Sequence, residues 1–340
     1  MLFYLSDPCL FLLPDRKSSS IIIHINNITF RKRQAMQTQF NNIGAKDIPF
    51  SASLLKSAIQ KAVRRGDVDK ALSCTKSLLD KDPRACLRRL MVIVLEDGLL
   101  LPGYAELAIL TDRVRQKNVS LTEEDKTLVL TMVADLTRCE WRDFEKNNPD
   151  YSEDYKIAKL EDEELALINA INYRVRIGGW KDDMDMLRRF AKVWNKRFAE
   201  GTWDIKKLKS YFTGEVIEYA DVPYASIEDI PLQAIDFHSY PISKILLKKP
   251  YVSQLIQEAI PKDTRQWAKP WMSDEDMLNK IVWCERSGIS YKKVLWSGKL
   301  VDWLVEDKIP TEQWDNFKSI YHKIEDELNN LAVWFLNKAS

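Results

Sequence analysis

The 340-residue sequence lacks several features that mark common classes of protein. It contains no G-x-x-x-x-G-K-[ST] loop, whose backbone and lysine hold nucleotide phosphates, so we expect no ATP hydrolysis. It has only three histidines, at positions 24, 238 and 322, with no H-E-x-x-H spacing, and it has no C-x-x-C pair. These absences argue against a zinc site, and we expect neither a metal nor another cofactor.

Cysteine is also scarce. The five cysteines are scattered and odd in number, which argues against a disulfide framework and favours a reducing, cytoplasmic compartment. They are Cys9, Cys74, Cys86, Cys139 and Cys284.

The sequence has no large excess of positive or negative charge. The chain carries 51 Lys and Arg against 50 Asp and Glu, so no global field draws it toward nucleic acid or a membrane, and any basic surface must be local. A composition that is 45% apolar and 30% charged is typical of a globular protein. The length allows two domains.

The first 35 residues differ from the rest. Their apolar start is interrupted by Asp7 and Pro8, has no basic segment before it, and is too short to span a bilayer, so we expect no membrane anchor. Met36 is a plausible natural start. We interpret residues 1–35 as a translated leader or a disordered tail that is not native, with a genuine N-terminal hairpin as the alternative. Mass spectrometry of the natively expressed protein distinguishes them.

From residue 50 the pattern is helical. Apolar residues recur at three- and four-residue spacing in residues 54–65, 68–79 and 84–96. Gly66 suits the left-handed residue that ends the first helix, Asp67 suits the cap of the second, and Pro83 suits the start of the third. Further helices are expected at 104–117, 121–136, 161–177, 183–198 and 311–337. The predicted fold class is mainly α: a helical array followed by a second, mostly helical domain.

Two ordered blocks in this array have a recognisable pattern. The first reads S-A-x-x-K-x-x-R-x-x-D-x-D-x-A-L from Ser57, and the second runs from Asp82-Pro83 through Arg88-Arg89-Leu90 to Glu96-Asp97-Gly98. Together they resemble the start of the C-terminal oligomerisation domain of the replication-associated recombination AAA ATPases, the maintenance-of-genome-stability and Werner helicase-interacting type. The resemblance covers about residues 51–140.

That family's domain is similar to the collar of clamp loaders and assembles tetramers. The resemblance therefore implies a collar-like domain at residues 36–145, homo-oligomerisation, and association with DNA, a AAA ATPase or a clamp loader. The sequence departs from the family in lacking the ATPase core that precedes this domain. The segment 137–143 is also only a loose match.

The matched helices are locally basic, with ten basic and four acidic residues between positions 51 and 90. Such a patch can neutralise several phosphates, which makes the basic residues of the first helix candidates for DNA contact. The alternative is that the arginines pair with carboxylates and lock the helices together. The candidates for phosphate contact are Lys56, Lys61, Arg64 and Arg65. The candidates for structural ion pairs are Asp67, Arg88, Arg89, Glu96 and Asp97, with Arg64 and Asp69 as further members.

Residues 146–165 are polar and acidic and predict a connector into a Trp-rich domain at 166–340. Most tryptophans of this domain sit among apolar residues and are expected in its core. Trp267 and Trp271 lie in a polar, Pro-flanked segment and are candidates for exposed stacking on nucleic-acid bases.

One short segment brings a carboxylate, an imidazole and a hydroxyl together, at Asp236, His238 and Ser239. Neighbouring positions in a helix or strand seldom converge in space, so a helix cap and a packed histidine are expected rather than catalysis.

Three functional classes remain. The first is a non-catalytic, DNA-associated assembly protein of replication, recombination or repair in a bacterium, phage or mobile element. The second is an adaptor that docks on a AAA ATPase or clamp loader without touching DNA. The third is a metal-dependent nuclease, for which the sequence offers no convincing set of acidic ligands.

Overall fold

The computed structural model describes residues 48–116, 120–144, 155–236, 241–267, 272–295, 297–298 and 308–339. The predicted leader lies outside them. Residues Gly44–Ser340 form one compact unit. It is mainly α, which confirms the predicted fold class.

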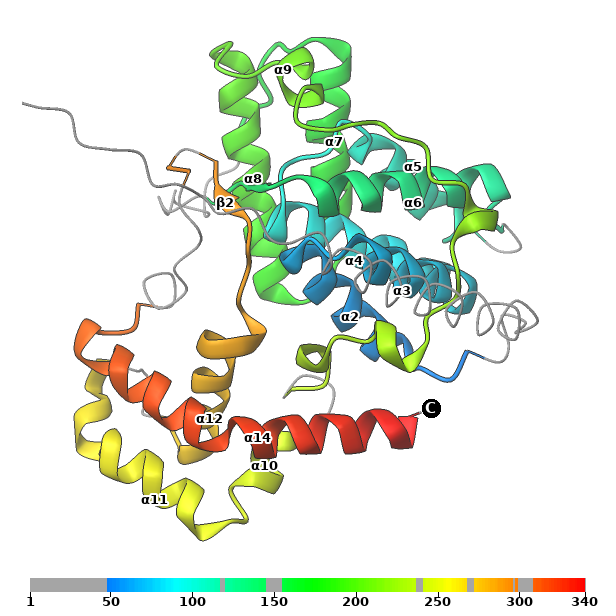
Figure 1. Ribbon diagram of the computed structural model, residues 1–340. Helices are drawn as coiled ribbons and strands as arrows, with labels where there is room; N and C mark the ends of the chain where they lie inside the picture. The colour runs from blue at the N-terminus through cyan, green and yellow to red at the C-terminus, as the bar shows by residue number, and fades with distance from the viewer. Residues whose placement is uncertain are drawn as a thin grey trace, which may run out of the picture. The chain divides into compact units, whose positions relative to one another are not determined.

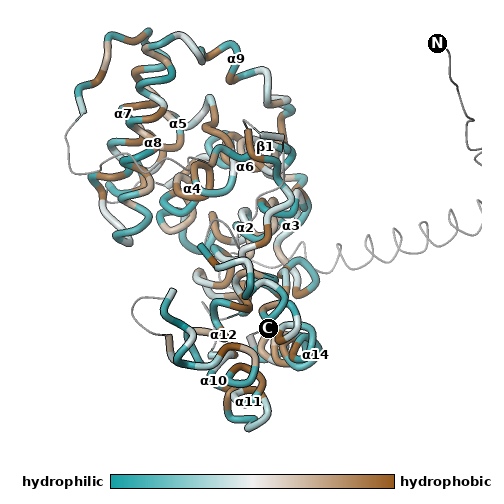
Figure 2. Tube along the Cα trace, turned by 90° about the vertical axis from the view of Figure 1, so that its left-hand side faces the viewer, coloured by the Kyte–Doolittle hydropathy of each residue, from teal (hydrophilic) through white to brown (hydrophobic). Residues whose placement is uncertain are grey.

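Five helices form the array (Figure 1). They are α2 (Ala52–Arg65), α3 (Val68–Lys81), α4 (Pro83–Asp97), α5 (Tyr104–Arg113) and α6 (Glu123–Arg138). Three predicted helix ends are confirmed. Gly66, at the end of α2, is left-handed at φ 68°. Asp67 caps α3 by accepting from the backbone N–H of Lys70, and Pro83 is the first residue of α4. Hydrophobic stretches gather where α2, α4 and α6 lie close together (Figure 2).

Two more helices, α7 (Asp162–Arg176) and α8 (Lys181–Ala199), pack on the array, α7 against α5 and α8 against α4. Their apolar faces join the same core as α2–α6. Helices on both sides of the predicted connector at 146–165 therefore share one core, and the packing does not divide there. Residues 145–154 lie outside the described ranges.

An extended segment, residues 213–224, crosses α6 and α3 after the short helix α9 (Ile205–Lys209). We call it the strap. Its backbone N–H groups bind a row of side chains on α6: Thr213 N donates to Asp135 Oδ1 at 3.0 Å, and Ile217 N donates to Thr131 Oγ1 at 3.0 Å. Tyr219 N donates to Thr127 Oγ1, also at 3.0 Å.

The strap is also tied to α3. The hydroxyls of Tyr219 and Tyr224 donate to Asp80, and Lys76 Nζ donates to the carbonyls of Tyr219 and Val222 at 3.0 and 2.6 Å. Three 3₁₀ turns follow or overlap the strap: η2 (Tyr219–Asp221), η3 (Ile227–Asp229) and η4 (Leu232–Ala234).

In a C-terminal group of helices, α14 packs on α10, α11 and α12, and their buried side chains are continuous with the core of the array. The group comprises α10 (Ile242–Leu246), α11 (Pro250–Ala259), η5 (Lys262–Trp267), α12 (Asp274–Val282), the π-helical turn η6 (Trp283–Ser287), η7 (Thr311–Gln313) and α14 (Trp314–Ala339). After η6 the chain returns to the array, where β2 (Lys293–Val294) pairs in parallel with β1 (Trp141–Arg142).

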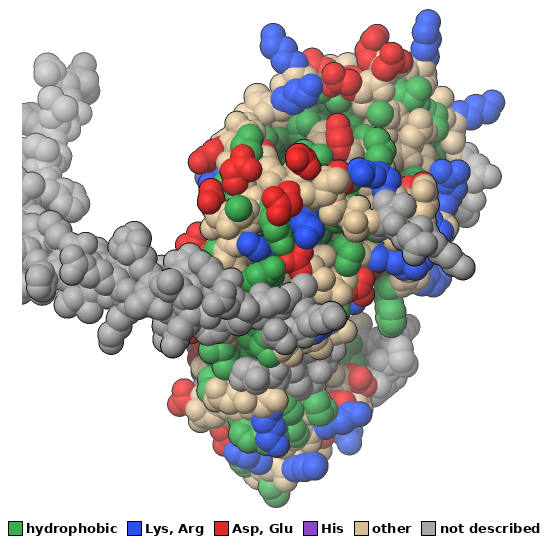
Figure 3. All heavy atoms as spheres, turned by 90° about the vertical axis from the view of Figure 1, so that its right-hand side faces the viewer, with side chains coloured by type: hydrophobic (Ala, Val, Ile, Leu, Met, Phe, Trp, Pro, Cys, Tyr) green, Lys and Arg blue, Asp and Glu red, His purple; other side chains and the backbone are tan. Residues whose placement is uncertain are grey.

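Beside this pair, Lys292 is buried and donates from Nζ to the carbonyls of Leu136, Thr137 and Cys139 at the end of α6. Burial lowers the pKa of Lys292 to about 8. Within the described ranges, every helix is too short or too polar to cross a lipid bilayer. Figure 3 shows a face on which basic and acidic side chains are interspersed, as a net charge near zero leads one to expect.

Candidate nucleic-acid interface

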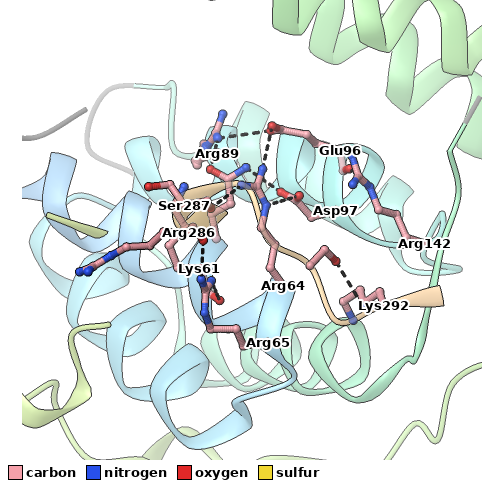
Figure 4. Close-up of polar contacts among 12 residues, drawn as sticks. Lys61, Arg64, Arg65, Arg89, Glu96, Asp97, Arg142, Arg286, Ser287 and Lys292 are labelled. Carbon is pink, nitrogen blue, oxygen red and sulfur yellow. Dashed lines mark hydrogen bonds and ion pairs between the residues drawn. The ribbon is translucent and has the colours of Figure 1, made fainter. Parts of the chain in front are cut away.

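Several residues that carry the resemblance, among them Arg64, Glu96 and Asp97, meet in a buried network beside α2 (Figure 4). Arg64 is its centre: Nε donates to Asp97 Oδ1 at 2.5 Å, and Nη2 donates to Glu96 Oε1 at 3.2 Å. Nη1 reaches the carbonyl of Ser287 in η6 at 3.2 Å. The predicted pairing of Arg64 with the acidic pair at the end of α4 is thus present, and it also ties α2 to the C-terminal group.

Asp97 is fully buried and also accepts from Gln60 Nε2 at 2.6 Å. Burial would raise the pKa of Asp97, but Arg64 and Arg142 outweigh that effect and the net pKa is lowered. The carboxylate is therefore held ionised as the counter-charge of a buried guanidinium.

Lys61 and Arg64 lie in the interior, at 1% and 2% exposure. The Lys61 ammonium is 5.3 Å from the centroid of the Trp283 ring, and burial together with Arg64 lowers the pKa of Lys61 to about 7. A DNA backbone cannot reach side chains that are this enclosed. The prediction that these two residues contact phosphate therefore does not fit their positions, because α2 turns them toward η6 rather than toward solvent.

Arg65 is half-buried and is also used within the protein. Its Nη1 donates to the carbonyl of Lys61 at 3.1 Å and its Nη2 to that of Arg286 at 3.0 Å. Desolvation by burial lowers its pKa. Arg65 thus adds a second bond between α2 and η6.

Asp236 serves the same junction. It is 2% exposed, lies 3.2 Å from Arg286 Nε and accepts from the Ser287 hydroxyl. Burial raises its pKa. Its partners come from η6 rather than from a helix start, and His238 and Ser239 lie outside the described residues.

The other predicted pairs divide into two groups. Arg89 joins the network, with Nη2 on Gln60 Oε1 at 2.5 Å and on Glu96 Oε2 at 3.3 Å, and it also reaches Asp183 in α8 at 3.5 Å. Asp67 does not join it, because it caps α3 and pairs with Lys70 at 3.3 Å.

Arg88 lies outside this network and contacts the turn between α7 and α8. Its Nη2 donates to the carbonyl of Gly178 at 2.9 Å, and the same carbonyl accepts from Arg174 Nη1 at 2.8 Å. Within the described part of the chain, neither guanidinium has a carboxylate partner at ion-pair distance. Burial and the nearby charge of Arg88 act to lower the pKa of Arg174. Two positive charges are therefore close together, and the nearest carboxylate that acts on Arg174 among the described residues, Asp183, is beyond ion-pair distance from it.

These arginines line a groove of about 850 Å³ between α2, α4, the turn before α8, and η6. Two of its three acidic members, Glu96 and Asp183, pair with Arg89. The third, Asp182, accepts from the Trp180 indole at 3.1 Å and keeps its negative charge, because the indole N–H is neutral. Lys56 is half-buried at its wall. The other lining residues are Ser53, Ser57, Gln60, Ala85, Arg88, Arg89, Val92, Arg174 and Trp283.

Trp180 stands at the groove with 71% of its surface exposed. The two preceding glycines set its position: Gly178 is left-handed at φ 74°, and a Cβ on Gly179 would lie 3.2 Å from Met184 and 3.3 Å from Arg174. Sequence reasoning missed both Trp180 and Arg174. The Gly-Gly-Trp run was the available signal for an exposed aromatic, whereas placing Arg174 requires the packing of α7 on α4.

The two predicted stacking tryptophans lie elsewhere. Trp267 is half-buried against the C-terminal core, with its ring 6.3 Å from that of Phe317. Its ring therefore packs inside rather than standing exposed as predicted. Trp271 lies outside the described residues.

The described residues hold no cluster of three or more His, Cys, Asp or Glu side chains suited to a metal ion. Comparison with known proteins gave no match, either to a protein-family model or to curated sequences or solved structures.

Proposed function

We propose that this chain is a non-catalytic assembly protein that associates with DNA in replication, recombination or repair. The observation that carries the proposal is the groove, in which Trp180 is exposed and Arg88 and Arg174 have no carboxylate partner at ion-pair distance among the residues that the structure describes. Surfaces that bind nucleic acid combine cations for the phosphates with aromatic rings for the bases.

The resemblance to the collar-like domain supports the assembly part of the proposal. The residues proposed to contact DNA differ from those predicted from the sequence. Lys56 remains a candidate and Arg88 joins it, whereas Lys61 and Arg64 are enclosed. The residues of the resemblance then hold the wall of the groove in place, since Arg89 and Glu96 line it and are bonded to the network below.

A second candidate function is an adaptor that docks on a AAA ATPase or clamp loader. A separate hollow of about 640 Å³ exposes apolar side chains that suit a protein partner, whether that ATPase or a second copy of this chain: Tyr291 at 61% and Val333 at 46%. An adaptor would bind that partner and not DNA.

Fluorescence anisotropy of single-stranded, duplex and forked DNA, titrated with the full chain from low to physiological salt, tests the proposal. We expect binding that weakens steeply with salt. The double variant Lys56→Gln with Arg88→Gln should lower the salt slope by about 2, roughly one for each phosphate contact removed. The matched control is Lys244→Gln with Lys249→Gln, two exposed lysines outside the groove, and should leave the slope unchanged.

Absence of binding at low salt would contradict the proposal and favour the adaptor. Incubating the DNA with magnesium or manganese in the same experiment tests the nuclease alternative, and we expect the DNA to stay intact.

A further inference from the structure

The groove has a geometry that distinguishes one form of DNA from another. This inference rests on the proposed function and specifies its ligand. The feature that carries it is one hollow lined by the exposed indole ring of Trp180, in the turn before α8, and by two cations, Arg88 of α4 and Arg174 of α7.

The cationic part is suited to a phosphate. Among the described residues, the Arg88 guanidinium donates one hydrogen bond, from Nη2 to the carbonyl of Gly178, which leaves its other N–H groups for a ligand in the groove. Arg174 is 4% exposed and lies beneath, where its Nε and Nη1 are held by the carbonyls of Arg88 and Gly178. An anion bound to Arg88 would reduce the repulsion between the two guanidinium groups.

The aromatic part is suited to a base. Trp180 is two residues from the carbonyl that both arginines share, so a ligand on Arg88 is near the indole. A base within a duplex is stacked on its neighbours and shows no face to a side chain, whereas a single strand can turn a base onto an aromatic ring. A hollow of about 850 Å³ is within the size range of sites that hold small ligands, and so accepts a nucleotide unit.

We propose that the groove binds single-stranded DNA, with a base stacked on Trp180 and the adjoining phosphate on Arg88. Lys56 supplies a second positive charge along the wall. The network around Arg64 positions this wall and does not touch the strand.

The test compares a short labelled oligothymidylate with an abasic strand of equal length and with a duplex, by anisotropy from low to physiological salt. For Trp180→Ala we expect roughly ten-fold weaker binding of the oligothymidylate, because one stacked base is lost, and unchanged binding of the abasic strand. Arg88→Gln should weaken binding of both strands and lower the salt slope by about 1. The control Trp334→Ala removes another exposed tryptophan, outside the groove, and should change neither.

Because the Trp180 ring is mostly exposed, Trp180→Ala should keep the melting temperature of the unmodified protein, which a thermal melt checks. Equal binding of the oligothymidylate by Trp180→Ala and the unmodified chain, or duplex binding as tight as single-strand binding, would overturn this inference while leaving the proposed function standing. If the unmodified chain binds no DNA at all, the proposed function fails with it.

Discussion

At the scale of single residues, the guanidinium of Arg64 and the carboxylate of Asp97 meet where water is excluded. Both side chains are almost fully buried, at 3% and 0% exposure. Removing one member of such a pair leaves the other as an uncompensated buried charge, which costs far more than the intact pair contributes.

For Asp97→Asn we therefore expect a loss of about 3 kcal/mol in the free energy of unfolding, measured by urea denaturation. The matched control is Asp185→Asn, whose partners Lys181 and Arg188 are exposed, and it should lose much less stability because water screens this pair. Similar losses in the two variants would show that the buried Arg64–Asp97 pair stabilises the fold no more than an exposed ion pair does.

Lys61 gives the protein a pH dependence whose sign follows from its pKa. The folded state binds the Lys61 proton weakly, with a pKa of about 7 against 10.5 for an unperturbed lysine. Above pH 7 the unfolded chain holds more protons than the folded chain, so stability from this group rises with pH between these two values.

Between about pH 6.5 and pH 8.5, the unmodified protein should gain about 2 kcal/mol of stability relative to Lys61→Met. Chemical denaturation at the two pH values measures this difference. Lys292 has the same sign of shift but is present in both proteins, so its contribution cancels. A difference that is zero or reversed would mean that Lys61 stays charged when buried.

The residue pairs show which details a sequence can predict. The pairing of Arg64 with Glu96 and Asp97 was predictable. Arg64 ends α2 and both acids end α4, and only α3 and two short turns separate these helices. The burial of Lys61 was not, since it depends on η6, more than 220 residues later along the chain. The exposure of Trp180 likewise depends on where the Gly-Gly turn leaves α7.

At the scale of elements, the strap shows how a segment without helix or strand is ordered. Thr127, Thr131 and Asp135 are spaced four residues apart and form one polar stripe on α6. Their oxygens accept hydrogen bonds from N–H groups of the strap that in a helix or strand would bind backbone carbonyls. Helix boundaries follow from caps and apolar spacing and were predicted to within a few residues. The conformation of the strap does not follow from such local signals, because its partners are side chains distant in sequence.

The double variant Asp135→Ala with Thr131→Val should release the strap. We expect faster hydrogen exchange at the amides of Thr213, Gly214 and Ile217, with a loss of about 1–3 kcal/mol in stability. Thr202→Ala removes a threonine hydroxyl bonded to a helix end outside the strap and serves as control. Unchanged exchange at these amides would mean that other contacts, such as those of Asp80, are sufficient.

At the scale of the whole molecule, the assembly proposal needs a surface for a second copy. The hollow beside α14 exposes Tyr291 and Val333 and carries both signs of charge, with Arg65 and Lys70 against Asp67. A patch of mixed sign can be complementary to itself across a two-fold axis.

We expect the unmodified chain to elute as a homo-oligomer and Val333→Asp as a smaller species, measured by light scattering after size exclusion. The control is Ile109→Asp, at an exposed apolar residue of α5 outside the hollow, and it should keep the oligomer. A monomeric unmodified chain at micromolar concentration would argue against self-assembly.

The bond from Lys292 to the end of α6 has a consequence for synthesis on the ribosome. The two partners Lys292 and Leu136 are 156 residues apart, so α6 emerges long before its last carbonyls gain this donor. The helices of the array are synthesised early, but the nascent chain cannot complete that helix end until translation has passed Lys292. The final steps of folding are therefore tied to the production of the C-terminal group.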